Sequence, residues 1–151
     1  MSSKKKAPPA WKGLWDIAFY ATAKGEAPAL SWLRSFPEVV EKRLVAIVIA
    51  VAQRPPPSFP NSSNEWQAMR TTMGGFFEAR DQHGKIDYRV FCILDRNTHA
   101  RPTVVLVSGG QKPDGTVMPA WVYNDARAYR DDYNKARRVG GAPWPPPGRK
   151  P

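Results

Sequence analysis

The stretch from Gly74 to Asp95, GGFFEARDQHGKIDYRVFCILD, predicts a β-hairpin. Two runs rich in aromatic and β-branched residues, GGFFEAR and IDYRVFCIL, favour strands. The intervening DQHGK is polar, and its Gly84 suits a short hairpin loop. The hairpin is the centre from which we expect the rest of a sheet to extend.

Four charged residues lie within these two strand runs. Because side chains alternate across a strand, Glu78 and Arg80 share one face of the first strand, and Asp87 and Arg89 share one face of the second. The opposite face of the second strand is apolar and predicts a core. Cross-strand ion pairs on a solvent-facing sheet are the plainest interpretation of the charge. The alternative is a face that binds an anion.

The flanking segments predict an α+β fold with the order strand, two helices, three strands, helix. Apolar residues at spacings of three and four predict the helices, and Pro37 and Pro119 suit helix starts. The expected elements are an edge strand over 14–20, helices over 27–36 and 37–54, strands over 74–80, 86–94 and 103–109, and a helix over 119–138. The proline-rich run over 54–64 is expected to form an irregular crossing.

The composition indicates one domain. The chain has 151 residues, 42% of them hydrophobic, which is enough for one core and too few for two ordinary domains plus tails. Cys92 is the only cysteine, so the sequence offers no disulfide framework. Its longest apolar run is far below the roughly 20 residues that a membrane helix needs, and the basic start lacks the apolar region of a secretory signal. These features favour a cytoplasmic protein without membrane association.

The formal net charge is +10, and much of it lies near the two ends of the chain. The ends hold six of the lysines and arginines, which leaves 17 basic and 13 acidic residues in the body. An excess of positive charge favours a polyanionic partner. Positive charge in disordered tails has a second explanation, because it can serve only to keep the protein soluble. We expect a disordered basic tail over 1–12, a single domain over 13–139 and a disordered Pro/Gly-rich tail over 140–151.

Two further elements are expected to bring cations to the charged hairpin. The third strand ends in SGGQKPDG, which predicts Lys112 on a loop at the strand's end. The terminal helix presents Tyr123, with Arg127 and Arg130 on its polar side. Such a cluster suits RNA cleavage by attack of a ribose 2′-hydroxyl on the adjacent phosphate, since fixed cations stabilise the charge of the transition state and a nearby group moves protons.

The motifs GGFFEAR, IDYRVF, VVLVSGGQKPDGTVMP and VYNDARAYRDDY, in this order and spacing, resemble the RelE/ParE toxin superfamily and its phage-derived, HigB-like branch. The resemblance covers roughly Leu14 to Arg138. It implies a RelE-like fold, a small mostly antiparallel sheet with an N-terminal helical hairpin and a C-terminal helix. It also implies the toxin of a type II toxin-antitoxin system, a ribosome-dependent endoribonuclease that cleaves mRNA without a metal or other cofactor and so inhibits translation. Its partners would be a cognate antitoxin protein, the ribosome and mRNA.

The resemblance also assigns catalytic residues by motif. Arg80, from the ELR-like tripeptide, and Arg89, from the YR pair, would bind phosphate. Lys112 matches the lysine after the last strand, and Tyr123 matches the tyrosine that stacks or assists proton transfer. Glu78 occupies the acidic position, where it would orient Arg80 or act as a base.

Four more residues are candidates for RNA binding: His83, Lys85, Arg127 and Arg130. His83 and Lys85 belong to the hairpin turn, where exposed polar residues are also common without a function. The two arginines would equally suit a solvated helix face, because neighbouring aspartates offset part of their charge.

The sequence departs from the HigB-like pattern in its lysine motif. Gln111 and Met118 replace a lysine and a threonine, which suggests weakened or lost nuclease activity. Two alternatives therefore stay open: a ParE-like gyrase poison, and a non-catalytic RNA- or protein-binding remnant of phage origin.

Overall fold

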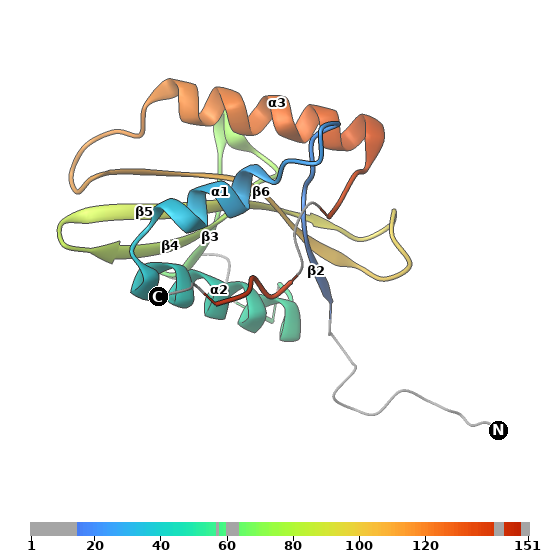
Figure 1. The fold of residues 1–151 in the computed structure, drawn as a ribbon, viewed down its shortest axis with the longest axis horizontal. Coiled ribbons are helices and arrows are strands. Elements are labelled where there is room, and N and C mark those ends of the chain that lie inside the picture. Colours follow the sequence, from blue (N-terminus) through green and yellow to red (C-terminus); the bar gives the residue numbers. More distant parts are fainter. Residues whose placement is uncertain (1–14, 57, 60–63, 141–143, 149–151) are drawn as a thin grey trace.

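The computed structural model describes residues 15–56, 58–59, 64–140 and 144–148. In this part of the chain, two N-terminal helices and a C-terminal helix pack on a five-stranded, mostly antiparallel sheet (Figure 1). The elements in chain order are β2 (Asp16–Phe19), α1 (Pro28–Ser35), α2 (Glu38–Gln53), β3 (Trp66–Ala68), the 3₁₀ turn η2 (Thr71–Met73), β4 (Phe77–His83), β5 (Ile86–Asp95), β6 (Thr103–Pro113) and α3 (Ala120–Ala136). The α+β prediction is confirmed.

The strand order across the sheet is β2-β6-β5-β4-β3. Among the described strands only β2 and β6 pair in parallel, and β2 lies at the edge, as predicted. The β4–β5 turn consists of Gly84 and Lys85, both with positive φ, at 60° and 66°. Two such residues match the twist of the flanking strands, so β4 continues to His83, beyond its predicted end at residue 80, and β5 begins at Ile86, as predicted. The strand β3 was not predicted.

Two cores fill the faces of the sheet. The first lies between one face and helices α1 and α2, and the second lies between the other face and α3 (Figure 1). Large fully buried members of the first core are Phe19, Leu33, Phe36, Leu44, Trp66 and Leu106, and those of the second are Tyr20, Phe76, Phe91 and Tyr133. The predicted alternation in β5 is confirmed, because Tyr88, Val90 and Cys92 face α1 and α2, whereas Phe91 and Ile93 face α3.

A β-bulge in β6 determines where Lys112 points. Successive residues of β5 pair with residues of β6 that are two apart, so Val107 is an extra residue in β6. An extra residue reverses the alternation beyond it, because side chains alternate with a period of two. Lys112 therefore faces the same side of the sheet as its partner Asp87, the side that α3 covers.

The strand β6 continues through Lys112, so the prediction that this lysine lies on a loop at the strand's end was wrong. The two glycines before it serve close packing rather than a turn. A Cβ at Gly109 would lie 2.9 Å from the Cβ of Trp32, and one at Gly110 would lie 2.6 Å from Cγ1 of Val122. Both glycines therefore let helices approach the strand from opposite faces.

Residues 144–148 lie against the domain, although they belong to the segment expected to be a disordered tail. The rings of Trp144 and Phe19 have centroids 5.6 Å apart, and Nη2 of Arg34 donates to the carbonyl oxygen of Pro147 at 2.6 Å. Burying an indole against the core offsets the entropy of ordering this short segment. The expected 1–12 tail lies outside the described residues.

Among the described residues, no helix is both long enough and apolar enough to cross a membrane.

Candidate functional site

Five residues predicted to act together lie on the α3 side of the sheet. Glu78 and Arg80 come from β4, Arg89 from β5, Lys112 from β6 and Tyr123 from the first turns of α3. The register places Arg80 directly opposite Arg89, and Asp87 directly opposite Lys112. The structure therefore brings the predicted catalytic residues together, and we call this group, with Asp87, the charged cluster.

Arg89 is the centre of the charged cluster. Its Nε lies 3.2 Å from Oε1 of Glu78, and its Nη2 lies 3.6 Å from Oδ2 of Asp87. Lys112 Nζ donates to the same Oδ2 at 2.8 Å. Asp87 thus links two cations, a role that the sequence analysis did not assign to it. The Glu78–Arg89 contact is a cross-strand ion pair of the kind that the sequence suggested, although both side chains are largely buried.

Arg80 differs from the other cations of the charged cluster. Its Nε is buried and has no hydrogen-bond partner among the described residues, and no ion pair of Arg80 occurs in that part of the chain. It also faces Arg89 across the strands, and like charges in that position repel. A buried donor without a partner is costly, so Arg80 is the member of the cluster best prepared to bind an added anion.

The two carboxylates of the cluster have opposite pKa shifts. Burial raises the pKa of Glu78 above its ordinary value, and this effect outweighs the nearby Arg89 and Arg80. Burial also opposes ionisation of Asp87, but the hydrogen bond from Lys112 and the charge of Arg89 outweigh it and lower the pKa of Asp87. Burial lowers the pKa of Arg89, although a guanidinium stays protonated at neutral pH. Glu78 is therefore the carboxylate suited to proton transfer.

Tyr123 connects the charged cluster to the second core. Its ring is half-buried and lies 5.7 Å from the ring of Phe91, centroid to centroid. Burial, and then the charge of Glu78, raise the pKa of Tyr123. Its hydroxyl is therefore protonated at neutral pH and available to donate a hydrogen bond.

Two hollows meet at the Glu78–Arg89 ion pair. The first, of about 510 Å³, lies between Glu78, Tyr123 and the segment 67–73, and we call it the β3 hollow. The second, of about 500 Å³, contains Arg80 and Arg89, and we call it the arginine hollow. Its lining residues are Asn64, Glu65, Arg80, Asp81, Gln82, Asp87, Arg89 and Asp114. The arginine hollow thus has both cationic and acidic walls.

The four predicted RNA-binding residues do not gather in one place. By strand alternation His83 lies on the opposite face of the sheet from Glu78, and Lys85 is exposed in the hairpin turn. Arg127 and Arg130 instead connect α3 to the segment around η2. Nη1 of Arg127 donates to the Thr72 hydroxyl at 3.2 Å, and Nη1 of Arg130 donates to the Gly74 carbonyl at 3.0 Å.

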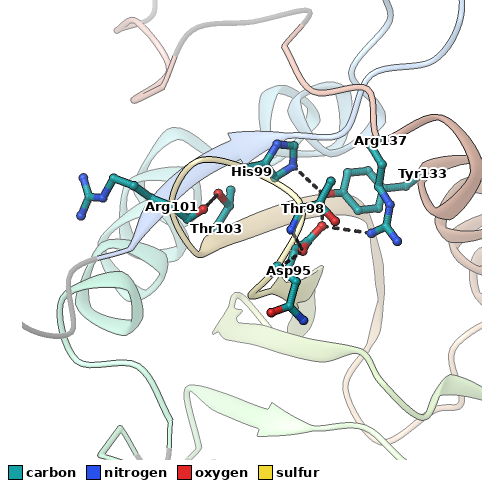
Figure 2. A network of polar contacts seen from close by, with 8 residues as sticks. Asp95, Thr98, His99, Arg101, Thr103, Tyr133 and Arg137 are labelled. Atoms are coloured by element: carbon teal, nitrogen blue, oxygen red, sulfur yellow. Dashed lines mark hydrogen bonds and ion pairs between the residues drawn. The ribbon is translucent and has the colours of Figure 1, made fainter.

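A separate polar network joins the end of β5 to the end of α3 (Figure 2). The Tyr133 hydroxyl donates to Oδ2 of Asp95 at 2.5 Å, so Nε2 of His99 donates to the Tyr133 oxygen at 2.7 Å. Arg137 Nη1 adds a bond of 3.0 Å to the same Oδ2. Burial opposes ionisation of Asp95, but hydrogen bonds from Tyr133 and two backbone amides lower its pKa to about 2. This network stabilises the domain away from the charged cluster.

The charged cluster contains no metal site, and the chain has no recognised relative among the proteins compared. Within the described residues, no group of three His, Cys, Asp or Glu side chains is arranged to hold a metal ion. No protein-family model, curated protein or solved structure matches this chain.

Proposed function

We propose that this protein is the toxin of a type II toxin-antitoxin pair, a cytoplasmic endoribonuclease that cleaves mRNA on the ribosome. The observation that carries the proposal is the convergence of Glu78, Arg80, Arg89, Lys112 and Tyr123 from four elements on one face. The resemblance to RelE-like and HigB-like toxins selected these same residues from their motifs. A cognate antitoxin and the ribosome are the partners that the proposal requires.

The proposed reaction is an internal transesterification. The ribose 2′-oxygen attacks phosphorus, the 2′-O–P bond forms and the P–O5′ bond breaks, which leaves a 2′,3′-cyclic phosphate and a free 5′-hydroxyl. Glu78, with its raised pKa, accepts the proton of the 2′-hydroxyl. Arg80 neutralises the phosphoryl oxygens as charge develops on them. The protonated Tyr123 hydroxyl is the candidate donor to the departing 5′-oxygen.

Arg89 and Lys112 act mainly by positioning. Arg89 holds Glu78 through a contact of 3.2 Å, and Lys112 neutralises Asp87 at 2.8 Å. Their positive charges remain within the charged cluster, where they still make the electrostatic potential at a bound phosphate more positive and so lower the energy of the anion.

The acidic walls of the arginine hollow favour a second candidate function. Glu65, Asp81, Asp87 and Asp114 repel a polyanion, and Arg89 and Lys112 already have carboxylate partners. A non-catalytic protein that binds RNA or another protein through this face is consistent with that arrangement. Such a protein would bind RNA in a salt-dependent manner and leave translation intact.

Purified protein added to ribosomes carrying a defined mRNA tests the proposal. The nuclease reaction predicts cleavage that requires the ribosome and produces 2′,3′-cyclic phosphate ends, and Arg80→Met should abolish it. Intact mRNA in the presence of a folded protein would contradict the proposal. Relaxed or cleaved DNA-gyrase products with intact mRNA would support the gyrase alternative instead.

A further inference from the structure

The β3 hollow lies beside the charged cluster and is large enough for a small ligand. Its lining residues are Gln67, Ala68, Met69, Arg70, Thr71, Thr72, Met73, Glu78 and Tyr123. A volume of about 510 Å³ lies within the range of sites that hold small ligands. Only Glu78 and Tyr123 of this group were predicted from the sequence, because 64–73 shows no strand period or motif.

The wall of the β3 hollow is fixed in place by several contacts. The Met69 amide donates to the carbonyl oxygen of Phe76 at 2.9 Å, which closes the loop around η2. Arg127 and Arg130 of α3 hold this loop at Thr72 and Gly74, and the Arg130 guanidinium lies 4.8 Å from the centre of the Phe76 ring. A wall held by α3 and by a hydrogen bond across its own loop is suited to ligand selection, because little conformational entropy remains to be lost on binding.

Backbone strain lies within the same wall. Thr71 has a φ of 55°, in the left-handed region that non-glycine residues seldom adopt. Its side chain is exposed and donates to the Arg70 carbonyl at 2.7 Å. Strain of this kind persists where the surroundings enforce it and is common at ligand-binding sites.

Polar groups without partners line the β3 hollow. Gln67 stands directly opposite Glu78 in the β3–β4 register, so both side chains face the α3 side. In the described part of the chain, the side-chain carboxamide of Gln67 and the guanidinium of Arg70 have neither a hydrogen-bond nor an ion-pair partner. A carboxamide offers a donor and an acceptor side by side, the pattern that pairs with the edge of a nucleobase.

We propose that the β3 hollow is a nucleobase subsite, in which Gln67 hydrogen-bonds the base edge and the methionines and Tyr123 contact its face. The base belongs to a nucleotide whose phosphate lies at Arg80 in the adjoining arginine hollow. The subsite would add base selection to the proposed nuclease, and its biological meaning rests on that proposed function. Stacking on an aromatic ring and hydrogen bonds to exposed base edges are the usual means of recognising single-stranded RNA.

The four nucleoside 3′-monophosphates and inorganic phosphate are the probes for this subsite. Affinities are measured by NMR titration of the full chain and of three variants. Gln67→Ala removes the proposed base contact. Arg80→Met removes the proposed phosphate contact. Gln53→Ala is the matched control, because Gln53 is an exposed glutamine in α2, on the other face of the sheet.

For the parent and for Gln53→Ala, we expect the affinities for the four nucleotides to differ by about tenfold between the tightest and the weakest. This is the scale of one well-placed hydrogen-bonded pair. Gln67→Ala should reduce that spread to less than about twofold and leave the affinity for inorganic phosphate unchanged. Gln67→Glu, which retains the side-chain length, should change the order of preference. Arg80→Met should weaken all five probes.

Several results would overturn the subsite. The first is that the nucleotides bind the parent no more tightly than inorganic phosphate does, and the second is that the parent binds the four nucleotides with equal affinity. The third is that Gln67→Ala leaves the differences in affinity among the nucleotides intact. Failure of the subsite and failure of the nuclease are distinguishable. Ribosome-dependent cleavage with an unchanged base preference in Gln67→Ala would reject the subsite alone, whereas base-selective binding by a protein that leaves mRNA intact would reject the nuclease alone.

Discussion

Removal of Arg89 should destabilise the protein, whereas removal of Arg80 should not. The Arg89 side chain is 8% exposed, and its partners Glu78 and Asp87 are 14% and 10% exposed. Arg89→Met would leave two buried carboxylates with less compensation, a change that costs roughly 3–5 kcal/mol in comparable buried ion pairs. For a chain of this size, that corresponds to a decrease in Tm of roughly 6–20 °C.

Arg80→Met should change the free energy of unfolding by less than about 1 kcal/mol, because Arg80 has no ion-pair partner in the described part of the chain. The substitution also removes the repulsion between the directly opposed Arg80 and Arg89. Methionine retains most of the aliphatic stem, so the comparison isolates the guanidinium in each variant.

Urea unfolding followed by tryptophan fluorescence measures both effects. Glu78→Gln combined with Arg89→Met should recover part of the lost stability, because the double variant no longer buries an unpaired Glu78 carboxylate. The deficit of Arg89→Met should also be larger at pH 7 than at pH 5. Arg89 lowers the pKa of Glu78 against the effect of burial, so its removal should raise that pKa further above the parent's, and proton uptake at lower pH should stabilise the variant more than the parent.

Equal stabilities of Arg80→Met and Arg89→Met would refute this reasoning. So would a double variant that is less stable than Arg89→Met alone. Either result would mean that Arg89 is not the structural centre of the charged cluster.

Two further substitutions test other parts of the domain. Tyr133→Phe should cost about 1.5–3 kcal/mol at pH 7, because it removes the 2.5 Å bond to the Asp95 carboxylate. The lowered pKa of Asp95, about 2, stabilises the fold above about pH 4 and ceases to do so as the pH falls toward 2. Urea titrations should therefore show the deficit shrinking across that range, and a constant deficit would contradict the assignment. Gly110→Ala should cost about 1–3 kcal/mol and lower Tm, because its Cβ would lie 2.6 Å from Cγ1 of Val122, and an unchanged Tm would contradict the packing.

Local patterns were enough to predict most of the fold. Alternation identified the two faces of β5, and helical spacing with a proline at each start located α2 and α3, where Pro37 and Pro119 occupy the N-cap positions. The strand β3 was missed because three residues, Trp66–Ala68, are too few to show a period. The position of β3 in the sheet depends on its pairing with β4, a tertiary contact that a local sequence pattern does not predict.

The sequence predicted which residues belong to the candidate site, but not which of them contact one another. Glu78 and Arg80 follow from alternation within one strand, whereas Lys112 reaches the same face only because a bulge reverses the alternation of β6. The role of Asp87 as the shared partner of two cations depends on that bulge. The Asp95–Tyr133 bond likewise joins residues 38 apart in the chain, which only the tertiary fold brings together.

Cleavage of mRNA on the ribosome by the charged cluster is the activity that we propose for this protein. Mapping of mRNA 5′ ends after brief induction, for the parent and for Arg80→Met at matched protein levels, tests it most directly. The nuclease predicts new 5′ ends in register with codons for the parent and none for Arg80→Met. Identical 5′ ends before and after induction of the parent would contradict it.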